Sequence, residues 1–146
     1  MQEDMNFKTI DLEAEESVLG AMFLSGDAII KAQGIVTEGD FSHVNYQTIF
    51  SMLVAMHAQG RSIDPLTVRD FMGDDAIAKL GGLPTIYYVC ESVPTAAHVE
   101  HHAIIVLQCS MQRKLIEVVN ALGEDAKLPA GDELADLIER FLVVIE

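Results

Sequence analysis

Apolar residues recur at intervals of three and four along most of the chain, which is the spacing of one face of an α-helix. Strict alternation of apolar and polar residues, which would indicate strands, is missing, and no hairpin turn of the Asn-Gly type occurs. The pattern therefore predicts an all-α fold.

Residues that favour helix ends divide the first part of the chain into about five to six short helices. Asp11 precedes a run with three glutamates, so a cap and acidic side chains fall where the helix dipole favours negative charge. Asp64 and Pro65 are a second start signal, while Gly73 and the pair Gly81-Gly82 predict helix ends. We predict a compact helical head over residues 11–94. Its expected core includes Leu12, Val18, Leu19, Met22, Phe41, Ile49, Phe50 and Leu53.

Residues 96–122 contain neither glycine nor proline, which favours one long helix. Such a helix of roughly 27 residues would span about 40 Å. A turn is expected at 123–131, and a last helix from Asp132. The two helices would form a long antiparallel hairpin over residues 95–146, and residues 1–10 are expected to be a flexible N-terminus.

The long helix carries two apolar edges, and one partner helix cannot cover both. The first edge is expected to pack against Phe141 and Leu142 of the last helix through Leu107, Met111, Leu115 and Val118. The second edge predicts contact with another chain, and two basic residues lie near it. The predicted partner or oligomer interface is Ile105, Arg113, Lys114, Ile116, Val119 and Leu122.

The charge of the chain argues against several classes of ligand. The 146 residues include 23 Asp and Glu but 9 Lys and Arg, giving a net charge of −14. A surface this acidic repels phosphate, so strong direct nucleic-acid binding and a polybasic membrane contact are not expected. No apolar run, including residues 103–107, approaches the length of a membrane span, and the acidic N-terminus does not resemble a signal peptide. A cytoplasmic location is expected.

The sequence offers little catalytic chemistry. None of the five lysines follows a glycine, so the chain contains no P-loop, and no catalytic residue or cofactor is expected in it. His98, His101 and His102 have spacings that can place imidazoles on one helix face for a metal. Glu100 points away from that face, so we expect no metal site. A metal-dependent enzyme built on these histidines stays as an alternative, which elemental analysis would test.

One family resemblance draws these observations together. The run D-L-E-A-E-E-S-V-L-G-A at residues 11–21 resembles the opening of DnaB-type replicative helicases, where D-L-E-A-E-x-A-V-L-G recurs. Glu-Gly-Asp-Phe at 38–41 is similar to the Pro-Glu-Asp-Phe of that family. Further similar segments follow in the same order at residues 45–50, 63–68, 81–83 and 92–100.

The resemblance covers the N-terminal domain of that family and the hairpin after it. It implies a hairpin that pairs with a neighbour to give dimers, and a trimer of dimers that forms a collar on a hexameric ring. It also implies docking of the C-terminal domain of primase, or of a helicase loader, on that collar. The RecA-like motor domain of the family, which uses ATP and magnesium, is not in this sequence.

Two departures from the family pattern bear on partner docking. His101 and His102 replace a Tyr-Tyr pair, and Thr85 stands where many members have tyrosine after the double glycine. A phage-type or divergent helicase would fit these differences. A free-standing adaptor or inhibitor that mimics the collar is the alternative. Its reading frame would end here, whereas a chain that stops within the apolar run of residues 142–145 looks like part of a longer protein.

Overall fold

The computed structural model describes residues 8–124, which form seven α-helices and no strand. The all-α prediction is confirmed, and six short helices precede the long one. The elements are α1 (Leu12–Leu24), α2 (Gly26–Gln33), α3 (Val44–Ala58), α4 (Pro65–Met72), α5 (Asp74–Lys79), α6 (Leu83–Cys90) and α7 (Val99–Glu124), with a turn of 3₁₀ helix, η2 (Glu38–Asp40), before α3.

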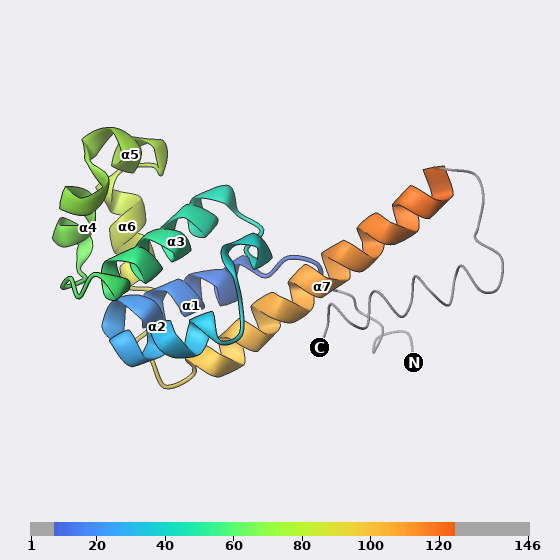
Figure 1. The fold of residues 1–146 in the computed structure, drawn as a ribbon, viewed down its shortest axis with the longest axis horizontal. Coiled ribbons are helices and arrows are strands. Elements are labelled where there is room, and N and C mark those ends of the chain that lie inside the picture. Colours follow the sequence, from blue (N-terminus) through green and yellow to red (C-terminus); the bar gives the residue numbers. More distant parts are fainter. Residues whose placement is uncertain (1–7, 125–146) are drawn as a thin grey trace.

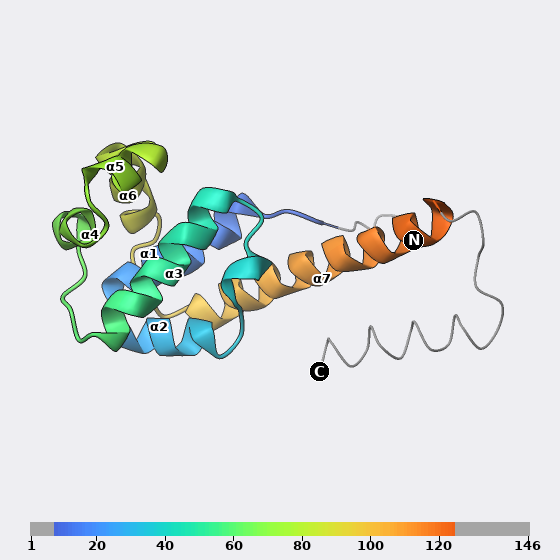
Figure 2. The same ribbon diagram turned by 45° about the horizontal axis from the view of Figure 1, so that its top comes forward.

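Helix α1 lies at the centre of the head and contacts α2, α3, α6 and α7. Helices α4, α5 and α6 form the end of the head that lies farthest from the projecting part of α7 (Figures 1 and 2). The first half of α7 runs along α1 and α2, and its second half extends beyond the head in both views. The fold therefore presents the second half of α7 away from the other described helices.

Local capping sets the helix boundaries. The Asp64 carboxylate accepts hydrogen bonds from the backbone N–H groups of Leu66 and Thr67 at 2.8 and 2.9 Å, which confirms the predicted start of α4 at Pro65. Gly73 ends α4 with φ of 88°, a left-handed conformation that glycine adopts without strain.

Local side-chain contacts also affect the starts of α3 and α7. Helix α3 begins at Val44, where Nδ1 of His43 caps it by accepting from the N–H of Asn45 at 3.1 Å. Helix α7 begins at Val99 rather than Ala96. There Oγ1 of Thr95 accepts from the N–H of Ala97 at 3.1 Å, a local turn that competes with helix formation.

The predicted core is buried apart from its first member. Leu12 is 42% exposed, so its assignment to the core is wrong. It is the first residue of α1, and its neighbours Ile10 and Glu13 are exposed as well, which shows that this turn lies at the edge of the core. The buried members are Val18, Leu19, Met22, Phe41, Ile49, Phe50 and Leu53.

Glu15 is a buried polar residue that helical periodicity did not reveal, with 1% of its surface exposed. Its carboxylate accepts from the backbone N–H and the hydroxyl of Ser42, at 3.1 and 2.6 Å, and from the N–H of His43 at 3.4 Å. Glu15 therefore holds the segment that leads into α3 against α1, in addition to lying in the first turns of its own helix.

Gly20 lets α6 approach α1 closely. A Cβ atom at this position would lie 2.9 Å from the carbonyl oxygen of Val89 and 3.2 Å from Cγ2 of Val93. The hydroxyl of Ser92 fills the same space and donates to the carbonyl of Glu16 at 2.8 Å. This contact fixes the distance between α1 and the C-terminal end of α6.

Part of the predicted hairpin lies outside the described residues. This applies to most of the turn at 123–131 and to the last helix with Phe141 and Leu142, while residues 1–7 of the expected N-terminal segment also lie outside. The hairpin therefore stays a prediction. None of the helices within residues 8–124 combines the length and apolar character needed to cross a membrane.

Candidate partner interface on the long helix

The first half of α7 belongs to the core of the head. Val99, Ala103, Val106 and Cys109 are buried there. Ile105, one of the predicted interface residues, is half-buried and packs against the same core. The structure therefore places Ile105 against the head.

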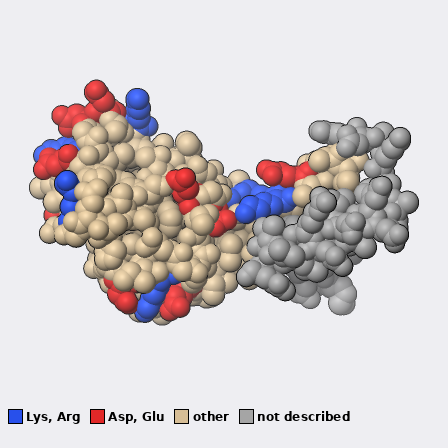
Figure 3. Space-filling model, in the orientation of Figure 1, with Lys and Arg blue, Asp and Glu red and all other residues tan. Residues whose placement is uncertain are grey.

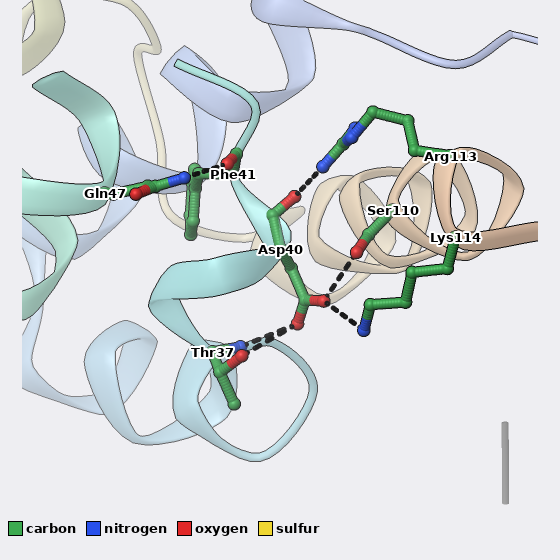
Figure 4. Close-up of polar contacts among 7 residues, drawn as sticks. All are labelled: Thr37, Asp40, Phe41, Gln47, Ser110, Arg113 and Lys114. Carbon is green, nitrogen blue, oxygen red and sulfur yellow. Dashed lines mark hydrogen bonds and ion pairs between the residues drawn. The ribbon is translucent and has the colours of Figure 1, made fainter. Parts of the chain in front are cut away.

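A buried carboxylate connects the head to the middle of α7 (Figure 4). Asp40 at the end of η2 is 5% exposed, and its Oδ2 accepts from the N–H of Thr37 at 2.8 Å. Its Oδ1 accepts from the hydroxyl of Ser110 at 2.7 Å and lies 3.7 Å from Nζ of Lys114. One side chain therefore closes the η2 turn and holds it against α7.

Arg113 strengthens the same junction through backbone carbonyls. Its guanidinium donates to the carbonyl of Asp40 and to the carbonyl of Thr9, both at 2.8 Å. We call the contacts of Asp40 with Ser110, Arg113 and Lys114 the Asp40 junction. Basic side chains gather where α7 leaves the head (Figure 3), and the junction gives two of them a structural partner.

Exposed apolar side chains follow immediately after the junction. Leu115, Ile116 and Val119 are 40%, 44% and 57% exposed, and we call these three residues the apolar strip. They lie within about 6 Å along the helix axis. The apolar strip is therefore the candidate interaction surface of the described residues.

The predicted interface residues thus separate into three groups. Ile116 and Val119 lie in the apolar strip, and Leu122 is half-buried one turn beyond it. Arg113 and Lys114 contact the head, although the Lys114 side chain keeps 49% of its surface exposed. Ile105 packs in the head, so the structure brings only part of the predicted set together on the stretch of α7 that the other described helices leave uncovered.

The Asp40 junction itself was missed by sequence reasoning. Ser110 is 1% exposed, and it stands three residues before Arg113 on a helix whose neighbouring positions are apolar. A lone hydroxyl on the buried side of a helix calls for a hydrogen-bond partner, and this was the available signal. The partner is 70 positions earlier in the chain, which local patterns do not reveal.

We expect Asp40→Asn to lower the free energy of unfolding by about 1–3 kcal/mol. The amide keeps the shape of the side chain but removes the charge facing Lys114. It also replaces one accepting oxygen with an NH₂ group, so either the Thr37 donors or the Ser110 hydroxyl lose their acceptor. Urea denaturation followed by circular dichroism measures the change. Asp70→Asn is the control, because Asp70 is exposed and its ion pair with Arg69, at 3.9 Å, lies at the surface. Equal stability of the two variants would contradict the structural role of the junction.

The three histidines lie together near the start of α7. The ring centroids of His98 and His102 are 6.4 Å apart, and those of His101 and His102 are 5.7 Å apart. Across residues 8–124 no group of three or more His, Cys, Asp or Glu side chains is arranged to hold a metal ion. Burial lowers the pKa of His102, and the neighbouring His101 and His98 lower it further, while Asp11 and Glu13 oppose the shift.

The lowered pKa of His102 predicts a pH-dependent stability. An unfolded histidine takes up a proton near pH 6.5, above the pKa of the folded group, so the unfolded state binds more protons as the pH falls. The melting temperature should therefore fall between pH 7.5 and pH 5.5, and His102→Gln should reduce that fall. Thermal denaturation at the two pH values is the measurement, and an unchanged pH difference in His102→Gln would contradict the assignment.

Comparison with known proteins agrees with the resemblance found in the sequence. Residues 8–108 match the DnaB-like helicase N terminal domain. The chain belongs to this family. The region that matches the family ends at residue 108, before Arg113. The apolar strip and most of the Asp40 junction lie beyond it, and they are described from the structure of α7 in this chain.

Curated relatives of this DnaB-like domain are replicative DNA helicases. The chain is 32% identical over 129 residues to replicative DNA helicase DnaC of Bacillus subtilis, covering 88% of this chain and 28% of the relative. It is 33% identical over 115 residues to DnaB of Geobacillus stearothermophilus, covering 78% of this chain and 25% of the relative. The chain thus spans about a quarter of the length of these relatives.

Solved structures share the fold of this DnaB-like domain. The N-terminal domain of DnaB helicase from Mycobacterium tuberculosis matches with a TM-score of 0.77 and 28% identity, covering 93% of this chain and 96% of the other. A DnaB-like replicative helicase, described with its interactions with primase, matches with a TM-score of 0.71 and 20% identity. That alignment covers 93% of this chain and 32% of the other, and at this identity it shows the fold alone.

Proposed function

We propose that this domain forms part of the collar of a hexameric replicative DNA helicase and acts through protein–protein contacts. The observation that carries the proposal is the apolar strip on the part of α7 that extends beyond the head. Unwinding activity would belong to a motor domain that binds ATP and magnesium, because the chain itself contains no Gly-Lys pair for a P-loop. A cytoplasmic location follows from this role.

The first expected partner is a second copy of the chain. Ile116 and Val119 expose apolar surface in the single chain, and a symmetric contact between two copies would cover it. The predicted hairpin of residues 95–146 would provide the framework for this pairing. Three such dimers would make the collar. The Asp40 junction supports the arrangement because it holds α7 at a defined angle to the head.

The second expected partner is the C-terminal helical domain of primase. Ile116, Val119 and Leu122 span about 9 Å along α7, which suits one helix lying in a groove, so a primase helix there would compete with the second copy for Ile116 and Val119. The acidic chain, with Glu117 exposed beside these residues, favours a partner helix with basic residues and faster association at low salt. A DnaB-like replicative helicase of the same fold has been described with its interactions with primase, so primase is tested here before a helicase loader.

Titration calorimetry with the C-terminal domain of the primase from the same organism tests this docking. We expect micromolar affinity, and Leu122→Ala should weaken binding by about 1–3 kcal/mol if this side chain is a buried anchor. Leu66→Ala is the matched control, because Leu66 is 51% exposed on α4 in the head. Absence of heat at tens of micromolar with a folded domain would refute primase docking, and a helicase loader would become the next candidate.

A further inference from the structure

A hollow of 540 Å³ lies between α1 and the C-terminal end of α6. None of its residues belongs to α7, so the hollow is separate from the apolar strip. Its lining is Glu13, Glu16, Ser17, Tyr88, Glu91 and Ser92. The close contact at Gly20 fixes the two helices that form its walls. The hollow is therefore a preformed feature of the head.

The carboxylate of Glu16 has a fixed orientation in this hollow. The phenol of Tyr46 donates to its Oε2 at 2.6 Å, and the phenol of Tyr88 donates to its Oε1 at 3.2 Å. The negative charge of Glu16 raises the pKa of Tyr88, and burial raises the pKa of Tyr46. Both phenols therefore stay protonated donors at neutral pH. Two hydroxyl donors do not neutralise a carboxylate, and its charge stays available to a ligand.

The hollow combines negative charge with an exposed aromatic wall. Within residues 8–124, no lysine or arginine forms an ion pair with Glu13, Glu16 or Glu91, whereas Asp27 and Asp40 each have a lysine partner. The Tyr88 residue is 61% exposed. A cation entering here would meet the carboxylates of Glu13, Glu16 and Glu91 beside the Tyr88 side chain.

We propose that this hollow binds an arginine side chain from a basic segment of a partner protein. A guanidinium presents a planar set of donors that matches carboxylates, and it stacks favourably on an aromatic face. Lysine carries a compact, strongly hydrated charge, so it pairs with carboxylates and stacks on an aromatic ring less favourably than arginine does. Nucleic acid would be repelled by the same carboxylates. The proposal concerns the head alone and does not depend on the collar role of α7.

A nuclear magnetic resonance titration tests the proposal with a defined probe. The probe is a blocked pentapeptide of sequence Gly-Arg-Gly-Arg-Gly, and its reference replaces both arginines with citrulline, which has a similar shape but no charge. We expect amide shifts confined to residues 13–17 and 87–92 with the arginine peptide, and none with the citrulline peptide. A lysine version should bind at least about threefold more weakly.

Variants separate this site from general attraction to an acidic protein. Glu91→Gln and Tyr88→Ala should each weaken binding at least about fivefold, while Tyr88→Phe, which keeps the ring, should weaken it less. Glu117→Gln removes an exposed carboxylate of α7 and should leave binding unchanged. Shifts spread over the whole acidic surface, equal effects of Glu117→Gln and Glu91→Gln, or equal binding of the lysine or citrulline peptide would each overturn the proposal.

Discussion

The Glu15→Ala variant is expected to be less stable than the wild-type chain by about 3–5 kcal/mol. The carboxylate of Glu15 is almost completely buried and accepts from the N–H and hydroxyl of Ser42 and from the N–H of His43. Alanine would leave these donors without a partner in a site that excludes water. It would also leave a void where a large side chain fills the core.

Urea denaturation of Glu15→Ala, Glu15→Gln and Glu13→Ala measures this effect. Glu13 is an exposed glutamate in the same turn of α1, so Glu13→Ala should change stability by less than about 1 kcal/mol. Glu15→Gln keeps the shape of the side chain and one acceptor oxygen. The stability that it loses should lie between the losses of Glu15→Ala and Glu13→Ala. If Glu15→Ala and Glu13→Ala were equally stable, the buried carboxylate would have no structural importance.

Ile116→Asp or Val119→Asp is expected to weaken self-association by about 2–4 kcal/mol, which corresponds to a factor of about 30 to 1000 in the dissociation constant. Both side chains are exposed in the single chain and would be covered in the proposed dimer. An aspartate there would place an unpaired charge in an apolar contact, whereas in the monomer the same charge remains in water. The folded monomer should therefore lose little stability.

Sedimentation velocity over a range of concentrations separates these outcomes. Ile30→Asp is the matched control, because Ile30 is 58% exposed on α2 and lies outside the proposed interface. The control should associate like the wild-type chain, while the two α7 variants should sediment as monomers. Association that is unaffected by Ile116→Asp and Val119→Asp would place the interface elsewhere on the molecule.

The sequence predicts the helices well because their boundaries depend on neighbouring residues. Asp64 and Pro65 start α4 through contacts that span three positions. The contacts that tie helices together are different, since Glu15 meets Ser42 across 27 positions and Asp40 meets Ser110 across 70. Helical periodicity indicates which face is apolar, but it does not indicate which polar side chains meet between helices. Leu12 shows a related limit, because periodicity does not show where the core ends along a helix.

The sequence predicts the candidate interface in part, as it does the contacts of the fold. Ile116 and Val119 stand out because the apolar positions of the long helix exceed what one partner helix can cover. The position at which the head stops covering α7 depends on tertiary packing, which the sequence pattern leaves undetermined. Ile105 falls before that position and packs in the head, and Arg113 lies at it and binds backbone carbonyls of the head.

The oligomeric state of the wild-type chain tests the proposed collar role most directly. Size-exclusion chromatography with multi-angle light scattering at high micromolar concentration gives the mass of the assembly in solution. The proposed role predicts a mass at least twice the 16.0 kDa of one chain, decreasing towards that value on dilution. A constant mass of 16.0 kDa at every concentration, with the helical fold intact, would contradict it.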